Sequence, residues 1–199
     1  MTTKISIKNL KTAAFASQET LCFSATVYVD GKAFCTVRNE GTGGPNMFEA
    51  LPLGKDPLEV AIQALAVRLR PASVATRQEA DQQNEAAGMT AERLGWDAWW
   101  KAREEGKVVV THWEAFEDAV DDAVTDAVSS RDLKRSLKNR VLLTCEGERG
   151  VFQTKAMTPD ALKRALADPA LRERLGAEEI LNLLPFEKAL SIYKERGKG

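Results

Sequence analysis

Residues that build metal, disulfide or catalytic sites are scarce in this sequence. Cys22, Cys35 and Cys145 are its three cysteines, too few and too scattered for a disulfide framework or a zinc site. His112 is the one histidine, so a site with several histidine ligands is excluded. The sequence therefore predicts no metal site, no cofactor and no catalytic residue, and it favours a reducing, cytoplasmic setting for the thiols.

Long apolar segments are missing as well. No run approaches the roughly 20 residues of a membrane span. The opening segment MTTKISIKNLK lacks the apolar stretch of a secretory signal. Hydrophobic residues make up 44% of the 199 positions and charged residues 29%, an ordinary balance for a globular protein. We therefore expect no membrane partner.

An excess of one charge is absent from the whole chain but present in its segments. The 28 basic and 29 acidic residues give a net charge of −1, which argues against a uniformly basic nucleic-acid-binding protein. Residues 106–130 hold one basic and six acidic residues, whereas residues 131–157 hold seven basic and three acidic ones. This acidic block, followed at once by a basic block, is the strongest electrostatic feature of the sequence.

A dipeptide near the start of the chain indicates a β-hairpin. Asp30-Gly31 lies between two strand-like segments, and Asp-Gly is typical of a two-residue turn in which both residues adopt positive φ. A turn of that length pairs Val27 with Phe34 and places both side chains on the core face of the sheet. The same register leaves Cys35 on the opposite face.

The remaining segments are predicted to be mostly helical, with one further hairpin. Capping residues and apolar side chains at helical spacing indicate the helices. After a glycine-rich loop at 41–46, the expected elements are a helix that Asp56-Pro57 begins, a helix from Thr90 to about Glu105, a strand at 107–110, a long amphipathic helix from Trp113 to Val128 or beyond, a hairpin of 141–145 with 151–154, and short helices that begin at Thr158-Pro159, Asp168-Pro169 and Leu184-Pro185.

These elements predict an α+β fold. An N-terminal antiparallel β-hairpin or meander is followed by a mainly helical region with a second short hairpin and a C-terminal set of short helices. We expect a β-rich region at 1–55, a helical middle region with acidic and basic segments at 56–140, and a hairpin with short helices at 141–199. Two questions stay open: whether the three regions form one compact domain, and whether residues 72–89 are a linker or a solvent-exposed helix.

An acidic ladder follows one face of the predicted long helix. Its members, spaced four residues apart, are Glu114, Asp118, Asp122 and Asp126. Each like-charge contact at this spacing costs roughly 0.2–0.5 kcal/mol in an isolated helix, so something is expected to offset it. The alternatives are the helix dipole together with the basic segment that follows and plain solvation, a cationic surface on a partner protein, a divalent metal, or mimicry of DNA.

Three tryptophans share a face of another predicted helix. Trp96, Trp99 and Trp100 are spaced i, i+3 and i+4. They fit an aromatic core, but adjacent Trp99 and Trp100 point about 100° apart, which makes burial of both difficult. Because tryptophan is enriched at interface hot spots, a partner-binding role is the alternative.

A basic run follows the acidic ladder along the chain. It consists of Arg131, Lys134, Arg135, Lys138 and Arg140. Such a run can be a solvated face that neutralises the acidic ladder, or it can bind phosphate groups of a nucleic acid. Aromatic residues that could stack on bases are not interleaved with it.

Part of the N-terminal region resembles known sequences. The segments FASQETLCF at 15–23, VYVDGK at 27–32 and NEGTGG at 39–44 are similar to uncharacterised small accessory proteins of bacteria, phages and plasmids. The resemblance covers about residues 1–45 and transfers no activity or catalytic residue. It implies a place among the accessory genes of mobile elements, where inhibitors of bacterial immune systems such as anti-CRISPR proteins occur.

Together these patterns favour a non-enzymatic protein-binding module of a phage or mobile element, active in the cytoplasm of a bacterial host cell. Its expected partner is a protein with a basic surface, such as a CRISPR-type immune complex or another nucleic-acid-processing complex. One alternative is a metal-dependent enzyme that acts on a nucleotide or phosphorylated substrate. The other is a nucleic-acid-binding protein.

Overall fold

The computed structural model describes residues 3–51, 58–69 and 74–197. Its internal contacts divide the chain into two compact units, Met1–Val124 and Thr125–Gly199. The division falls inside one long helix, α5 (His112–Leu137), which contributes its first half to one unit and its second half to the other. Over the described ranges, no helix combines the length and apolarity that crossing a membrane requires.

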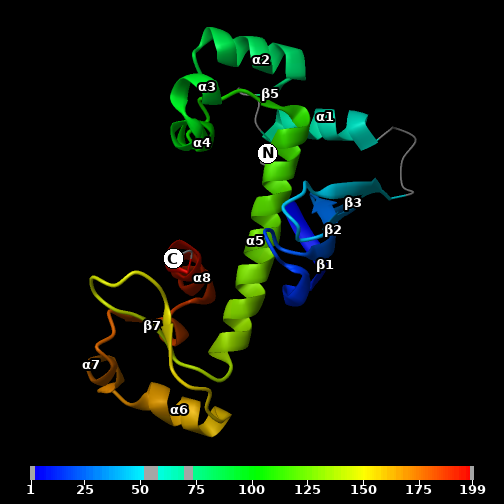
Figure 1. Cartoon of the computed structure of the whole chain (residues 1–199). Helices are drawn as coiled ribbons and strands as arrows, with labels where there is room; N and C mark the ends of the chain where they lie inside the picture. Colours follow the sequence, from blue (N-terminus) through cyan, green and yellow to red (C-terminus); the bar gives the residue numbers. More distant parts are fainter. Residues whose placement is uncertain (1–2, 52–57, 70–73, 198–199) are drawn as a thin grey trace. The chain divides into compact units, whose positions relative to one another are not determined.

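The first unit begins with a four-stranded antiparallel sheet, which confirms the predicted N-terminal meander (Figure 1). The strand order follows the chain. The strands are β1 (Ile5–Thr12), β2 (Phe23–Val29), β3 (Lys32–Asn39) and β4 (Met47–Ala50), and a short 3-10 helix, η1 (Ala14–Ala16), lies between the first two.

The predicted hairpin turn is present, but the register beyond it differs by one residue. Asp30 and Gly31 have φ angles of 48° and 81°, and Val29 pairs with Lys32. A bulge then pairs Val27 with Cys35, so the predicted pairing with Phe34 is wrong. Because successive side chains of a strand alternate between faces, this extra residue turns Cys35 into the core, where it is fully buried.

A glycine loop joins β3 to β4, as the sequence predicts. The carbonyl oxygen of Gly41 accepts hydrogen bonds from three successive backbone N–H groups, those of residues 18–20, at 2.8–3.4 Å. The Asn39 Oδ1 atom accepts from the Gly41 N–H and from the Thr20 hydroxyl, each at 2.8 Å. A Cβ atom at Gly41 would lie 2.3 Å from the Ala16 carbonyl oxygen, so only glycine fits there.

The helical part of the first unit follows the sheet. Its elements are α1 (Leu58–Leu69), β5 (Val74–Ala75), α2 (Arg77–Ala86), α3 (Ala91–Leu94), α4 (Trp96–Glu104), β6 (Val110–Thr111) and the first half of α5. Strand β5 pairs in parallel with β6. The predicted start at Asp56-Pro57 lies outside the described residues.

The structure answers one open question about this region and corrects one prediction. Residues 77–86 form α2, a solvent-exposed helix that buries only Ala80 and is capped by Thr76 and Glu79. The single helix expected from Thr90 to about Glu105 is divided in two. Gly95, with φ at 78°, ends α3 and precedes α4.

The second unit packs three short helices around a small sheet. After the second half of α5 come β7 (Leu142–Thr144), β8 (Phe152–Gln153), α6 (Pro159–Ala167), α7 (Leu171–Leu175), β9 (Glu179–Ile180), a 3-10 helix η2 (Leu181–Leu183) and α8 (Phe186–Arg196). Strand β7 pairs antiparallel with β8, as predicted, and with β9, which was not predicted. Helix α5 continues through Ser129-Ser130 and places Leu133 in the core beside Leu142 and Leu181.

Candidate functional site

Members of the acidic ladder have partners within the protein. The Glu114 carboxylate accepts from the Thr111 N–H at 2.8 Å, and the Thr111 hydroxyl accepts from the Glu114 N–H at 3.2 Å, so this pair caps α5. Asp118 forms an ion pair with Arg103 of α4 at 3.0 Å, and Asp126 forms one with Lys194 of α8. Asp122 is exposed.

These partners differ from the basic segment that the sequence analysis offered as one means of offsetting the acidic charges. That segment instead continues along the same helix, through Leu137, and the neutralising cations come from α4 and α8. The ladder is therefore integrated into the fold at Glu114, Asp118 and Asp126.

Two further carboxylates of α5 hold the loop before β4. Glu117 Oε1 accepts from the backbone N–H of Asn46 at 3.0 Å, and Asp121 Oδ1 accepts from its Nδ2 at 2.7 Å. Desolvation raises the pKa of both Glu117 and Asp121, and the neighbouring acidic charges raise it further, while the Asn46 hydrogen bonds lower it. The acidic side of α5 thus fastens the sheet of the first unit to the helix.

The tryptophan cluster is only partly a core. Trp96 and Trp100 are 66% and 50% exposed, so the core interpretation fails for these two side chains. Trp99, between them, is half-buried and donates a hydrogen bond from Nε1 to the Met89 carbonyl at 3.1 Å. The Trp99 ring meets Trp96 and Trp100 edge-to-face, with ring centroids 5.9 and 4.9 Å apart. The exposed Trp96 and Trp100 rings therefore both pack against Trp99, which is held by its hydrogen bond to Met89.

Arg103 connects the tryptophan cluster to the acidic ladder. Its guanidinium carbon lies 5.3 Å from the centroid of the Trp100 ring, and its Nη2 atom lies 3.0 Å from Asp118 Oδ1. The side chains of Arg103 and Asp118 are 15% and 23% exposed. Within the first unit, Arg103 thus contacts both an indole ring and a carboxylate.

A pocket of about 580 Å³ is lined by residues of α2, α3 and α4 and of the segment between α2 and α3. We call it the α2–α4 pocket. Trp96 and Trp99 line it, but Trp100 does not. The remaining lining residues are Asp81, Asn84, Glu85, Met89, Thr90, Ala91, Glu92 and Arg93.

The basic run lies on the second half of α5 and its C-terminal end. Arg131 pairs with the adjacent Asp132 at 3.4 Å, and the Lys134 ammonium lies 4.8 Å from the centroid of the Phe186 ring. Arg135 and Lys138 are exposed. Together with Ala127 and Ser130, these four cations line a shallow groove.

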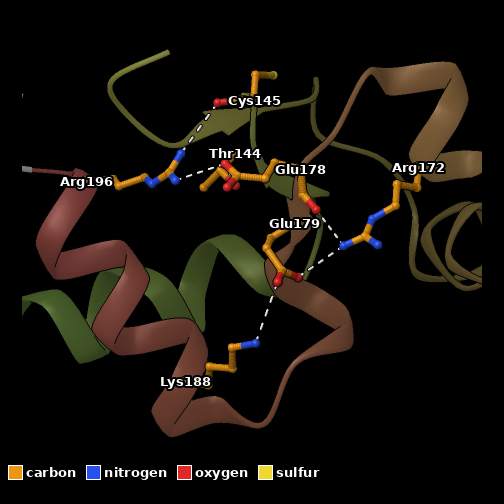
Figure 2. A network of polar contacts seen from close by, with 7 residues as sticks. All are labelled: Thr144, Cys145, Arg172, Glu178, Glu179, Lys188 and Arg196. Carbon is orange, nitrogen blue, oxygen red and sulfur yellow. Dashed lines mark hydrogen bonds and ion pairs between the residues drawn. The ribbon is translucent and has the colours of Figure 1, made fainter. Parts of the chain in front are cut away.

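A polar network that the sequence did not reveal joins the helices and the sheet of the second unit (Figure 2). Arg172 of α7 contacts the Glu178 carbonyl at 2.5 Å and the Glu179 carboxylate at 3.2 Å. From α8, Lys188 reaches Glu179 at 3.6 Å and Arg196 reaches Glu178 at 2.9 Å. Each of its two carboxylates is paired with at least one cation, as expected of a network that stabilises the fold.

Metal-ligating side chains do not gather among the residues that the structure describes, where no group of three or more His, Cys, Asp or Glu residues could hold an ion. The cysteines likewise stay free thiols; burial raises the pKa of Cys35 to about 12, and Cys22 and Cys145 are half-buried.

Comparisons with protein-family models, with curated proteins and with solved structures found no match to this chain. The case for a function therefore depends on the geometry of the surfaces described above. Of these, the exposed indoles of α4 and the adjoining α2–α4 pocket combine apolar area, charge and a fixed framework.

Proposed function

We propose that this chain is a non-enzymatic protein-binding module that docks its partner through Trp96 and Trp100. The observation that carries the proposal is the exposure of these two indoles, 66% and 50%, on a third indole that is itself anchored. Tryptophan is enriched among residues that dominate binding energy. A rigid aromatic side chain also loses little conformational freedom on binding.

A partner with a basic surface fits the charge of the first unit. Met1–Val124 contains 13 basic and 18 acidic residues, a net charge of −5, whereas Thr125–Gly199 contains 15 basic and 11 acidic residues, a net charge of +4. Complementary charge accelerates association and suppresses wrong partners. The exposed indoles belong to the acidic unit, so apolar contact and charge attraction would act on the same partner.

The proposed partner is a CRISPR-type immune complex or another nucleic-acid-processing complex of a bacterial host. Two arguments support this part of the proposal. The resemblance that the sequence suggests for residues 1–45 would place the chain among accessory proteins of mobile elements, whose setting includes such inhibitors. Complexes that bind nucleic acid also carry the basic surfaces that an acidic unit would meet.

Nucleic-acid binding by the second unit is the second candidate function. It is favoured by the groove of α5 in which Arg131, Lys134, Arg135 and Lys138 come together within a unit of net positive charge. Binding of this kind would depend steeply on salt, because each phosphate contact releases condensed counterions.

The test of the proposed function is partner capture with matched variants. The Trp96→Ala/Trp100→Ala double variant should lose partners that the wild-type chain retains from bacterial lysate, as identified by mass spectrometry. Phe152→Ala, which truncates a 42% exposed aromatic residue of the second unit, should retain them. Retention of the same proteins by the double variant would overturn the proposal. The second candidate would be favoured if the Arg135→Gln/Lys138→Gln variant captured less nucleic acid than the wild-type chain while the double tryptophan variant captured the same amount.

A further inference from the structure

We propose that the α2–α4 pocket binds an arginine side chain of the protein partner; this inference rests on the proposed function. Its volume, about 580 Å³, falls within the roughly 300–1,000 Å³ of ligand-binding clefts. Three features of the pocket select a guanidinium group: two indole walls, unpaired carboxylates and a fixed framework.

The carboxylates of the pocket differ from those of the acidic ladder. Asp81 and Glu85 follow each other by one turn of α2, and Glu92 comes from α3. Within the part of the chain that the structure describes, none of these three side chains makes a hydrogen bond or an ion pair. Arg93 is the single cation that lines the pocket, so three negative charges face one positive charge.

An arginine uses this combination of groups better than a lysine does. Its planar guanidinium stacks on an indole face and donates several hydrogen bonds in a fixed fork, whereas the lysine ammonium is a compact, strongly hydrated charge. Carboxylates one turn apart, such as Asp81 and Glu85, can accept from one guanidinium together. The apolar stem of the arginine would lie against Trp96 and Met89.

The protein itself provides a precedent for this chemistry. Arg103 lies over the Trp100 ring and pairs with Asp118, so this arginine already contacts both an indole and a carboxylate. The α2–α4 pocket presents the same types of group, with Trp96 and Trp99 beside the Asp81 and Glu85 carboxylates. The tryptophan cluster would thus hold one arginine of its own and one of the partner.

The framework of the pocket is fixed before any ligand binds. Asn84, which lines it, donates from Nδ2 to the Val109 carbonyl and accepts at Oδ1 from the Val109 N–H, each at 2.8 Å. The Nε1–H group of Trp99 is held by the Met89 carbonyl. A site whose walls are already ordered spends little binding energy on ordering them.

The test monitors the indole N–H signals of the four tryptophans in the ¹⁵N-labelled full chain. Nα-acetylargininamide should shift the Trp96 and Trp99 signals in a saturable way and leave Trp113 unchanged. Its uncharged isostere Nα-acetylcitrullinamide should shift neither, and Nα-acetyllysinamide should bind several-fold more weakly. Equal shifts with the citrulline compound, equal affinity for the lysine compound, or no shift with the arginine compound would each overturn the inference.

Matched variants assign the effect to the pocket. Asp81→Asn/Glu85→Gln should weaken arginine binding about tenfold or more, as expected for the loss of hydrogen bonds to charged groups. Asp97→Asn removes an exposed carboxylate of α4 that does not line the pocket, and it should leave the affinity unchanged. Equal weakening by both variants would indicate a long-range effect of charge and would contradict a pocket.

Failure of this inference can be distinguished from failure of the proposed function. Trp100→Ala should weaken binding of a purified partner but leave arginine binding intact, because Trp100 does not line the pocket. If partner binding depends on both indoles while the arginine compound shifts none, the pocket inference is wrong and the proposed function stands. If the arginine compound binds but the double tryptophan variant retains every partner, the proposed function is wrong.

Discussion

Two groups of carboxylates in the first unit differ in how the rest of the protein uses them. On α5, Glu114 caps the helix and Asp118 neutralises a half-buried arginine. At the pocket, Asp81 and Glu85 have no such partner among the described residues. The regular spacing on α5 is the conspicuous pattern in the sequence, yet its charges serve the fold. Asp81 and Glu85 have the same four-residue spacing but no partner among the described residues, so the spacing of charges alone does not show which of them a ligand could use.

The largest effect on stability should come from removing the asparagine that the α5 carboxylates hold. Asn46 is 9% exposed and donates to Asp121, while its Oδ1 accepts from Asn39. Because a hydrogen bond to a charged group contributes about 1.5–3 kcal/mol, Asn46→Ala should lower the free energy of unfolding by about 2–3 kcal/mol. In a protein of this size the melting temperature should fall by roughly 5–10 °C.

Asn139→Ala is the control for that variant, since its side chain is exposed. Calorimetry of the two variants should show a fall in melting temperature for the Asn46 variant alone. Equal melting temperatures would mean that the loop before β4 is not held by α5.

A smaller loss is expected when the ion pair between α4 and α5 is broken. Asp118→Asn leaves Arg103 half-buried without its carboxylate, which should cost about 1–2 kcal/mol and lower the melting temperature by roughly 2–8 °C. Asp122→Asn, one turn away and exposed, should leave stability unchanged or raise it slightly, because only like-charge repulsion is removed. Equal effects of the two substitutions would show that the ladder acts as a solvated face.

The pH dependence of stability should report Glu117 and Asp121. Both folded-state pKa values lie above the usual 4.5 and 3.8, so the folded state retains these protons longer than the unfolded chain. Their contribution to stability is therefore favourable at low pH and is lost as pH rises from the usual pKa through the raised one. In melts across this range, Glu117→Gln/Asp121→Asn should gain stability relative to wild type as pH increases. A constant difference would contradict the raised pKa values.

The smallest effect on stability should come from the pocket. Asp81→Asn/Glu85→Gln removes two exposed charges that have no partner in the described chain, so the melting temperature should change by less than about 2 °C. The same variant should lose arginine binding. A large fall in melting temperature would place these carboxylates with those of α5 and remove the contrast between the two groups.

Local patterns predicted the elements, and contacts between distant residues decided the details. Asp30-Gly31 predicted its turn, and Thr158-Pro159 predicted the start of α6, because each signal is contained in a few neighbouring residues. The bulge at Phe34 escaped prediction because the packing of the whole sheet selects the register. Asn46 also escaped, since its α5 partners lie 71 and 75 residues away.

The tryptophan cluster illustrates the same limit at the candidate site. Helical spacing correctly placed Trp96, Trp99 and Trp100 near one another, as their ring contacts show. It could not determine which ring is covered, because that depends on Met89 and on the break at Gly95. The pocket itself gave no signal in the sequence, since residues of three helices must come together to form it.

The glycine loop of the first unit is held by hydrogen bonds between residues that lie far apart in the sequence. Thr20 and Gly41 both donate to Asn39, and the Gly41 carbonyl accepts from the backbone N–H groups of residues 18–20. Any substitution at Gly41 would bring a Cβ atom into collision with the Ala16 carbonyl oxygen. Thr20, Asn39 and Gly41 therefore serve the fold of the sheet, so their presence in another sequence would indicate a shared loop and would say nothing about a shared binding partner.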